Sequence, residues 1–177
     1  MEANRTHMSA QPDLGPSDWV LRFGGMVPSG GRVLDVACGR GRHANWFADR
    51  GYRVHAVDRE PAKGISSQID FQQADIEAGP WPYVGQVFES VVVTNYLHRP
   101  LMQTLVGSVA KEGWLIYETF AAGNEQFGRP TRADFLLEPG ELLEVVRGRF
   151  RVIAYEHLFV KLPKPAVVQR IAAQRLE

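Results

Sequence analysis

The sequence predicts a three-layer α/β fold, in which a mostly parallel β-sheet lies between helices and ends in an antiparallel pair of strands. Short apolar runs alternate with helix-like segments along most of the chain, which is the pattern of βαβ units. The last two β-rich runs, 150–160 and 166–175, instead follow each other across a short turn-like link. Such a pair is a common addition at the edge of a parallel sheet.

Length and composition indicate one globular domain of ordinary polarity. The chain has 177 residues, and its 20 basic and 20 acidic side chains cancel to a net charge of zero. Because phosphate contacts supply most of the affinity for nucleic acid, this balance favours a small-molecule ligand over nucleic acid. The single cysteine, Cys38, fits a reducing, cytoplasmic location, and we expect no membrane association. We expect residues 1–13 to be a flexible tail and residues 14–177 to form the domain.

The first elements surround a glycine-rich turn. Residues 16–27 have the pattern of a helix, with Ser17 as its N-cap, and the run 32–37 reads as a buried strand. A second helix follows the turn and extends through Arg50, and Gly51 is suited to terminate it.

The remaining elements continue the alternation. Four further apolar runs predict strands at 53–58, 69–75, 87–97 and 113–120. Pro100 begins a helix that runs to about Ala110, because proline is favoured in the first helical turn. A long loop over 121–137 precedes another helix that starts near Pro139.

The turn after the first strand has the pattern G-x-G-x-x-A, from Gly39 through Gly41 to Ala44. Ligands of open α/β sheets bind beyond the carboxyl ends of the strands, where this turn lies. We expect Gly39 to permit the turn and Gly41 to let ligand atoms approach the backbone. Asp58 ends the second strand, 19 residues after Gly39, where an acidic residue reaches ribose hydroxyls. These features suit NAD and S-adenosylmethionine equally.

Three further observations favour S-adenosylmethionine. Asp35 places a carboxylate in the first strand, which would repel a pyrophosphate but suits an ammonium or a sulfonium. Asp75 follows the third strand, where it can accept a hydrogen bond from the exocyclic amine of adenine. A dehydrogenase normally needs a second domain for its substrate, and 177 residues leave no room for one.

These segments resemble the motifs of the class I S-adenosylmethionine-dependent methyltransferases. The stretch VLDVACGRGRHANWFA is similar to their motif I through Asp35, Gly39 and Gly41. VHAVD is similar to their acidic motif after the second strand, and QQADI to their adenine loop. The resemblance covers residues 16–175 and is closest to the small bacterial methyltransferases of the tellurite-resistance type. It implies a Rossmann-like methyltransferase sandwich with S-adenosylmethionine as cofactor. The implied cofactor site consists of Asp35, Ala37, Gly39, Gly41, His43, Asp58, Arg59, Asp75, Ile76 and Asn95.

Several of these side chains also have a structural interpretation. Asp35 can cap backbone amides of its own turn, and Asp75 can simply form a turn after its strand. Cys38 is better explained as a small packing residue than as a nucleophile.

The acceptor side of the site falls at the ends of the fourth and fifth strands. Here the chain reads TNYLHRP, without the Asn-Pro-Pro-aromatic motif of nucleic-acid amino methyltransferases, and it lacks an evident metal-binding set of acidic residues. His98 is the candidate base, because histidine changes charge near neutral pH, with a purely structural role as the alternative. The candidate substrate residues are Tyr96, Tyr117, Asn124 and Arg129.

The sequence therefore predicts a cytoplasmic methyltransferase that uses S-adenosylmethionine and a small-molecule acceptor. The first alternative is an S-adenosylmethionine-binding sensor or partner subunit without turnover. The second alternative is an NAD(P)-dependent oxidoreductase.

Overall fold

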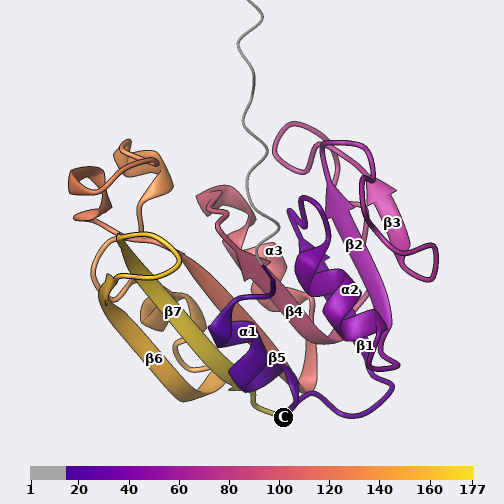
Figure 1. Cartoon of the computed structure of the whole chain (residues 1–177). Helices are drawn as coiled ribbons and strands as arrows, with labels where there is room; N and C mark the ends of the chain where they lie inside the picture. The colour runs from indigo at the N-terminus through magenta and orange to yellow at the C-terminus, as the bar shows by residue number, and fades with distance from the viewer. Residues whose placement is uncertain (1–14) are drawn as a thin grey trace, which may run out of the picture.

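The computed structural model describes residues 15–177, so the predicted tail 1–13 lies outside the described residues. These residues form one seven-stranded sheet with the order β3-β2-β1-β4-β5-β7-β6 (Figure 1). The strands are β1 (Arg32–Val36), β2 (Arg53–Asp58), β3 (Asp70–Gln73), β4 (Phe88–Thr94), β5 (Val109–Phe120), β6 (Phe150–Val160) and β7 (Ala166–Arg175). Strands β1 to β5 are parallel, and β7 runs antiparallel to both β5 and β6. The predicted fold class is confirmed.

Helices cover the two faces of the sheet and complete the three layers. Helices α1 (Asp18–Gly24) and α2 (Arg42–Ala48) pack on one face, where Trp19 and Phe47 join a core with Val92. Helices α3 (Met102–Gly107) and α4 (Glu141–Val146) pack on the other face, where Leu105 and Leu142 join a second core. Three short 3₁₀ helices lie in the connections: η1 (Arg99–Leu101), η2 (Asn124–Gln126) and η3 (Ala133–Phe135).

Strand β4 shows why a continuous apolar run forms the centre of this fold. Val91, Val92 and Val93 are all fully buried. Because successive side chains of a strand point to opposite faces, Val91 and Val93 join the α3/α4 core while Val92 joins the α1/α2 core. Burying each side chain stabilises the fold by roughly 1.5–3 kcal/mol.

The predicted N-cap and glycine terminator of the first two helices agree with the structure, although the helices end earlier than predicted, at Gly24 and Ala48. The Ser17 hydroxyl accepts a hydrogen bond from the Val20 amide at 3.2 Å, so it is the N-cap of α1. The Trp19 indole donates to the carbonyl of Ile171 at 3.1 Å and attaches this helix to β7. Gly51 follows α2 with a φ of +81°, the left-handed conformation that its predicted role as terminator requires.

Strand β5 begins earlier than predicted, at Val109, and the helix before it ends at Gly107. The pairing of β4 with β5 is irregular at this point, and Glu112 adopts a φ of +59°. A Cβ on Gly113 would lie 2.9 Å from the carbonyl oxygen of Ala110, so only glycine fits here. A bulge therefore extends the strand through a segment whose sequence reads as a break.

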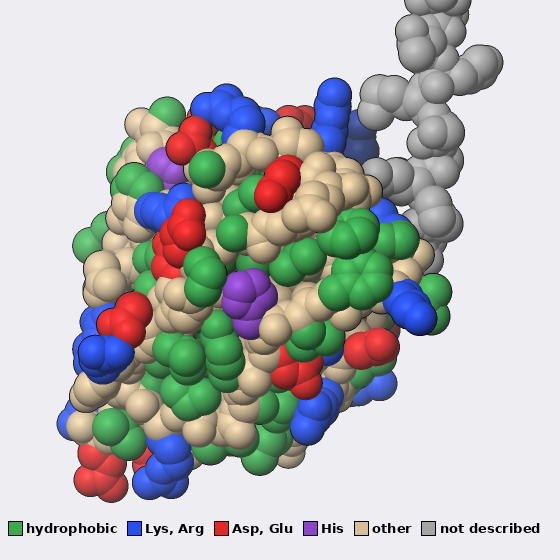
Figure 2. Space-filling view, turned by 90° about the vertical axis from the view of Figure 1, so that its left-hand side faces the viewer, with side chains coloured by type: hydrophobic (Ala, Val, Ile, Leu, Met, Phe, Trp, Pro, Cys, Tyr) green, Lys and Arg blue, Asp and Glu red, His purple; other side chains and the backbone are tan. Residues whose placement is uncertain are grey.

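The connections on either side of β3 contain no helix within the described structure. Instead, an aromatic cluster covers this part of the sheet: Tyr83 packs edge-on against Trp81 and Phe88, with ring centroids 5.5 Å apart in each pair. The opposite edge of the sheet is formed by β6. The space-filling view from this side shows apolar side chains interspersed with charged ones (Figure 2). No helix within residues 15–177 is long and apolar enough to cross a membrane.

Candidate functional site

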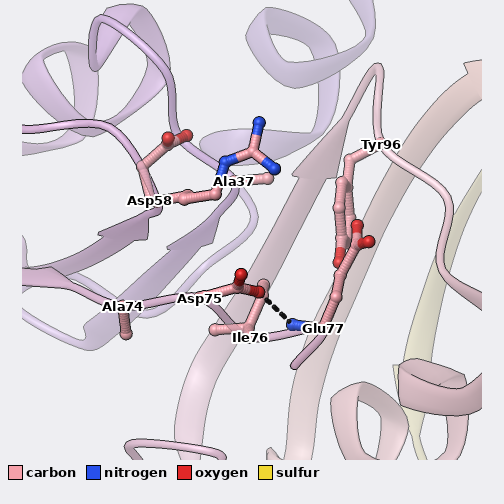
Figure 3. Close-up of a pocket in the computed structure, with 8 residues that line it drawn as sticks. Ala37, Asp58, Ala74, Asp75, Ile76, Glu77 and Tyr96 are labelled. Carbon is pink, nitrogen blue, oxygen red and sulfur yellow. Dashed lines mark hydrogen bonds between the residues drawn. The ribbon is translucent and has the colours of Figure 1, made fainter. Parts of the chain in front are cut away.

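The candidate site is a pocket of about 230 Å³ at the carboxyl ends of the parallel strands. Its lining residues follow β1, β2, β3 and β4, which end at the same edge because the strands are parallel and in register. They are Ala37, Asp58, Arg59, Ala74, Asp75, Ile76, Glu77 and Tyr96 (Figure 3). Five of the ten predicted cofactor residues and one predicted substrate residue therefore line one pocket.

Asp58 joins two turns at the rim of this pocket. Its Oδ2 accepts a hydrogen bond from the Gly39 amide and its Oδ1 accepts one from the Glu60 amide, both at 2.8 Å. A carboxylate has about four acceptor sites, so two acceptor sites of Asp58 stay available to a ligand.

Asp75 is both a turn former and a candidate ligand. Its Oδ1 accepts hydrogen bonds from the amides of Glu77 and Ala78, both at 3.0 Å (Figure 3). These hydrogen bonds lower the pKa of the Asp75 carboxyl, which therefore stays ionised at neutral pH. The neighbouring Ile76 side chain is buried and supplies an apolar surface in the same pocket.

The two glycines of the turn have different surroundings. Gly39 and Gly41 both adopt positive φ, at +56° and +73°. A Cβ on Gly39 would point into open space, whereas a Cβ on Gly41 would lie 2.8 Å from Cγ1 of Ile65. The Cβ side of Gly41 is therefore filled by Ile65, whereas that of Gly39 is open; that ligand atoms approach the Gly41 backbone stays a prediction.

Asp35 is buried beneath the turn and does not line the pocket. Its Oδ2 accepts a hydrogen bond from the Ala44 amide at 3.0 Å, so it does cap the start of α2. Its Oδ1 is also buried and has no hydrogen-bond partner among the described residues. Burial raises the pKa of the Asp35 carboxyl to about 7, against the lowering effects of this hydrogen bond and of Arg42.

His43 holds elements of the fold together. Its ring is 1% exposed, and its Nε2 accepts a hydrogen bond from the Ser17 amide at 3.2 Å. Nδ1 therefore carries the proton of the neutral ring and lies 3.2 Å from the Thr94 hydroxyl. Burial, and to a lesser extent Arg42, lowers the pKa of His43 to about 3. Both ring nitrogens are used inside the protein, so the predicted contact of this side chain with a cofactor is not supported.

A second pocket of about 300 Å³ adjoins the first and lies at the ends of β4 and β5. Glu77 and Tyr96 line both pockets. The other lining residues are Asn95, Leu97, Thr119, Phe120, Pro130 and Phe135. Asn95, a predicted cofactor residue with a φ of +54°, turns the chain sharply at the end of β4 and thereby brings Tyr96 between the pockets.

Two predicted substrate residues are part of the scaffold. The Tyr117 hydroxyl is buried and donates to the carbonyl of Tyr96 at 2.8 Å. The Asn124 side chain is also buried; it donates to the carbonyl of Pro130 at 3.1 Å and accepts from the Val167 amide at 3.1 Å. Both side chains thus bind inside the protein and line neither pocket, so the geometry gives no support to their predicted contact with a substrate.

The remaining two candidates lie beside the pockets. Arg129 is exposed and is not among the residues that line either pocket. His98 does not line them either, but its Nδ1 lies 3.8 Å from Oε2 of Glu77. Glu77 was missed in the sequence, although it follows Asp75 by only two residues, because nothing in the linear pattern separates it from an ordinary surface glutamate.

Comparisons with known proteins agree with this arrangement. The model of a methyltransferase domain family matches residues 7–160. An uncharacterized protein of Schizosaccharomyces pombe, UNK4.09, is 26% identical over 203 residues, which cover 86% of this chain and 59% of that protein.

Solved structures share the fold at low identity. TehB from Haemophilus influenzae superposes with a TM-score of 0.69 at 17% identity, covering 89% of this chain and 61% of TehB. The N-methyltransferase NodS from Bradyrhizobium japonicum, in complex with S-adenosylhomocysteine, superposes with a TM-score of 0.66 at 16% identity. The match covers 89% of this chain and 84% of NodS. A Burkholderia thailandensis 1,6-didemethyltoxoflavin-N1-methyltransferase superposes with a TM-score of 0.65 at 15% identity. The match covers 90% of this chain and 77% of that enzyme. The chain thus spans about three fifths of UNK4.09 and of TehB. From its motifs, its strand order and the family match, the chain belongs to the methyltransferase domain family and has the fold of the class I enzymes.

Proposed function

We propose that this protein is an S-adenosylmethionine-dependent methyltransferase that acts on a small molecule. The observation that carries the proposal is the charge of the first pocket, which is lined by three carboxylates and a single guanidinium, that of Arg59. S-adenosylmethionine presents a sulfonium and an ammonium, which such a pocket attracts. The pyrophosphate of NAD would instead meet like charge, which argues against the oxidoreductase alternative.

The residues of the pocket fit the parts of this cofactor. The available acceptor sites of Asp58 suit the two ribose hydroxyls, and Ile76 offers an apolar surface to adenine. The Oδ2 atom of Asp75 accepts no hydrogen bond from the described residues and can take the exocyclic amine. Near the glycine turn, the buried and unpartnered Oδ1 of Asp35 is an acceptor that an ammonium would satisfy, directly or through a water. When bound, the cofactor supplies an activated methyl group.

The second pocket supports a small-molecule acceptor. Its volume of about 300 Å³ is at the lower end of the range for small-ligand sites. It shares Glu77 and Tyr96 with the first pocket, so ligands in the two pockets would be in contact. Holding two reactants in contact and in line is the main task of a methyltransferase. NodS and the 1,6-didemethyltoxoflavin-N1-methyltransferase, both N-methyltransferases by name, have the same fold. The single cysteine supports a reducing, cytoplasmic location.

Calorimetric titration tests the cofactor, with S-adenosylhomocysteine, S-adenosylmethionine and NAD as ligands. We expect the two sulfur compounds to bind and NAD not to bind; binding of NAD alone would contradict the proposal. Turnover on a panel of amines, thiols, phenols, carboxylates and chalcogen oxyanions then tests catalysis. Tight cofactor binding without turnover on any class would favour the sensor or partner-subunit alternative.

A further inference from the structure

We propose that the second pocket selects acceptors whose reacting atom is an uncharged nitrogen on a planar apolar body, and that Glu77 imposes this choice. The inference rests on the proposed function, because it takes the second pocket as the acceptor site. Its basis is the distribution of charge and apolar surface around that pocket.

Glu77 is the one charged side chain among the described residues that line the second pocket. The other polar groups are the amide of Asn95 and the hydroxyls of Tyr96 and Thr119. No lysine or arginine from residues 15–177 lines it. An anionic acceptor would therefore meet a carboxylate and no compensating cation.

The nearby arginines already have carboxylate partners. Arg99 binds Glu141 with a nitrogen–oxygen distance of 2.7 Å, and Arg132 binds Asp134 at the same distance. Arg129 lies on the exposed loop, outside the lining. None of these arginines is therefore placed to hold an anionic acceptor in the second pocket.

Glu77 is located where the transferred group must pass, because it lines both pockets. Its backbone is held by the hydrogen bond from its amide to Asp75. Across the junction, the pKa of the Tyr96 hydroxyl is raised by burial and, secondarily, by the Glu77 carboxylate, which places the two groups close together (Figure 3). The Glu77 carboxylate therefore lies at the junction of the two pockets, where the methyl group would reach an acceptor in the second pocket.

The charge change during methyl transfer explains the preference. A neutral amine uses its lone pair to form the new N–CH₃ bond, while the electron pair of the breaking S–CH₃ bond stays on sulfur. The nitrogen becomes positively charged and afterwards releases its proton to solvent. A carboxylate beside that nitrogen stabilises the developing charge, as preorganised groups do in active sites. For an anionic oxygen acceptor, the same carboxylate only repels the reactant.

The remaining walls fit the body of such an acceptor. Phe120, Phe135, Leu97 and the ring of Tyr96 supply apolar surface, and Phe135 remains 43% exposed. Aromatic side chains stack well on planar rings. An aromatic or heteroaromatic amine satisfies both the walls and Glu77.

Two probes of equal size test the inference: benzylamine, whose ammonium imitates the nitrogen after methylation, and benzoate, its anionic counterpart. Each is titrated calorimetrically into protein saturated with S-adenosylhomocysteine. We expect benzylamine to bind at least about tenfold more tightly than benzoate, the scale of one charge-assisted hydrogen bond. In Glu77→Gln, likewise saturated with S-adenosylhomocysteine, this preference should fall to within about twofold at unchanged melting temperature.

The matched control is Glu112→Gln, which removes an exposed carboxylate at the other end of β5 and should keep the preference. Benzoate binding as tightly as benzylamine, or a preference that survives in Glu77→Gln, would overturn the inference while leaving the methyltransferase proposal intact. Failure of S-adenosylhomocysteine to bind would overturn the methyltransferase proposal itself.

Discussion

The Asp58 carboxylate accepts the Gly39 amide at 2.8 Å and so ties the end of β2 to the turn after β1. The group proposed to hold the ribose therefore also organises the glycine turn. Loss of this side chain should affect ligand affinity and local structure together, which calls for a conservative variant.

We expect Asp58→Asn to weaken S-adenosylhomocysteine binding by about tenfold or more, because hydrogen bonds to charged groups contribute roughly 1.5–3 kcal/mol. Asparagine keeps one acceptor oxygen and therefore only one of the two amide hydrogen bonds of Asp58, so the melting temperature should also fall moderately. Calorimetry and thermal unfolding measure the two effects. Asp49→Asn, at the exposed C-terminus of α2, is the control. Unchanged affinity in Asp58→Asn would mean that the ribose is held elsewhere.

The two glycines of the turn should respond differently to alanine. At Gly41 the new Cβ would lie 2.8 Å from Ile65, so Gly41→Ala should lower the melting temperature and displace the loop after β2. At Gly39 the new Cβ points into open space, so Gly39→Ala should cost only the strain of a positive φ, about 1 kcal/mol, and should instead impede the ligand.

The double variant Gly41→Ala/Ile65→Ala tests whether the clash with Ile65 is what destabilises Gly41→Ala. Removing the Ile65 side chain should restore part of the stability lost in Gly41→Ala, a coupling typical of residues in contact. Equal destabilisation by Gly39→Ala and Gly41→Ala would contradict the assignment of their surroundings.

Asp35 should make the protein without ligand less stable as pH rises. Its pKa is about 7 in the fold, above the ordinary value of 3.8, so the folded state holds the proton more tightly than the unfolded state. This contribution to stability is complete below pH 3.8 and is lost as pH rises through about 7. The effect is on the order of a few kcal/mol. His43 acts oppositely, because its pKa of about 3 makes stability fall on acidification from pH 6.5.

Asp35→Asn isolates the contribution of Asp35 to the pH dependence of stability. The variant keeps an acceptor for the Ala44 amide but no charge, so we expect it to unfold at a higher temperature than the wild type at pH 8. The advantage should shrink to less than half of its value at pH 8 near pH 5, because the loss begins only above pH 3.8, and S-adenosylhomocysteine affinity should decrease. Melting temperatures of both proteins from pH 5 to pH 8 provide the measurement; a difference independent of pH would refute the buried-charge explanation.

The predicted site positions that line the first pocket are those at the carboxyl ends of the parallel strands. Ala37, Asp58, Asp75 and Tyr96 each lie within two residues of the end of a strand, and register alone brings such positions to one edge. Their grouping could therefore be predicted from strand boundaries without knowledge of any tertiary contact.

Three of the predicted site residues have hydrogen-bond partners inside the protein, and they share one property. His43, Tyr117 and Asn124 are buried, and their polar atoms find partners in distant segments. A sequence shows that such a group needs a hydrogen bond but not whether protein or ligand supplies it. Glu77 was missed for the converse reason, since its position between two pockets depends on how the loop after β3 meets the end of β4, which the linear sequence does not show.

Arg99 should control the acceptor pocket from outside it. Its guanidinium forms a two-pronged pair with Glu141 and donates to the carbonyls of Asp134 and Leu136, at 3.0 and 2.8 Å. These contacts hold the segment that carries Phe135 against the second pocket.

We expect Arg99→Lys to raise KM for the acceptor severalfold and to speed hydrogen exchange in residues 121–137, because lysine cannot reproduce a forked geometry. S-adenosylhomocysteine affinity should stay unchanged. Arg147→Lys, which alters an exposed pair with Glu144, is the control. Normal exchange and normal KM in Arg99→Lys would show that the loop is held by its other contacts.

His98 should influence turnover through Glu77. Its Nδ1 lies 3.8 Å from the Glu77 carboxylate, its side chain is 27% exposed, and it lines neither pocket. A base that removes a proton from the acceptor directly would contribute about 10²–10⁴-fold to the rate. A group that only orients the carboxylate should contribute less, so we expect His98→Ala to lower kcat about tenfold, with cofactor affinity unchanged.

Two further variants test whether His98 acts through Glu77. His98→Gln can still donate a hydrogen bond to Glu77 and should recover most of the activity. In a Glu77→Gln background, His98→Ala should have almost no additional effect, because residues that act as a unit are not additive. A loss of about 10²-fold or more that glutamine does not rescue and that persists without the Glu77 carboxylate would instead make His98 the base itself.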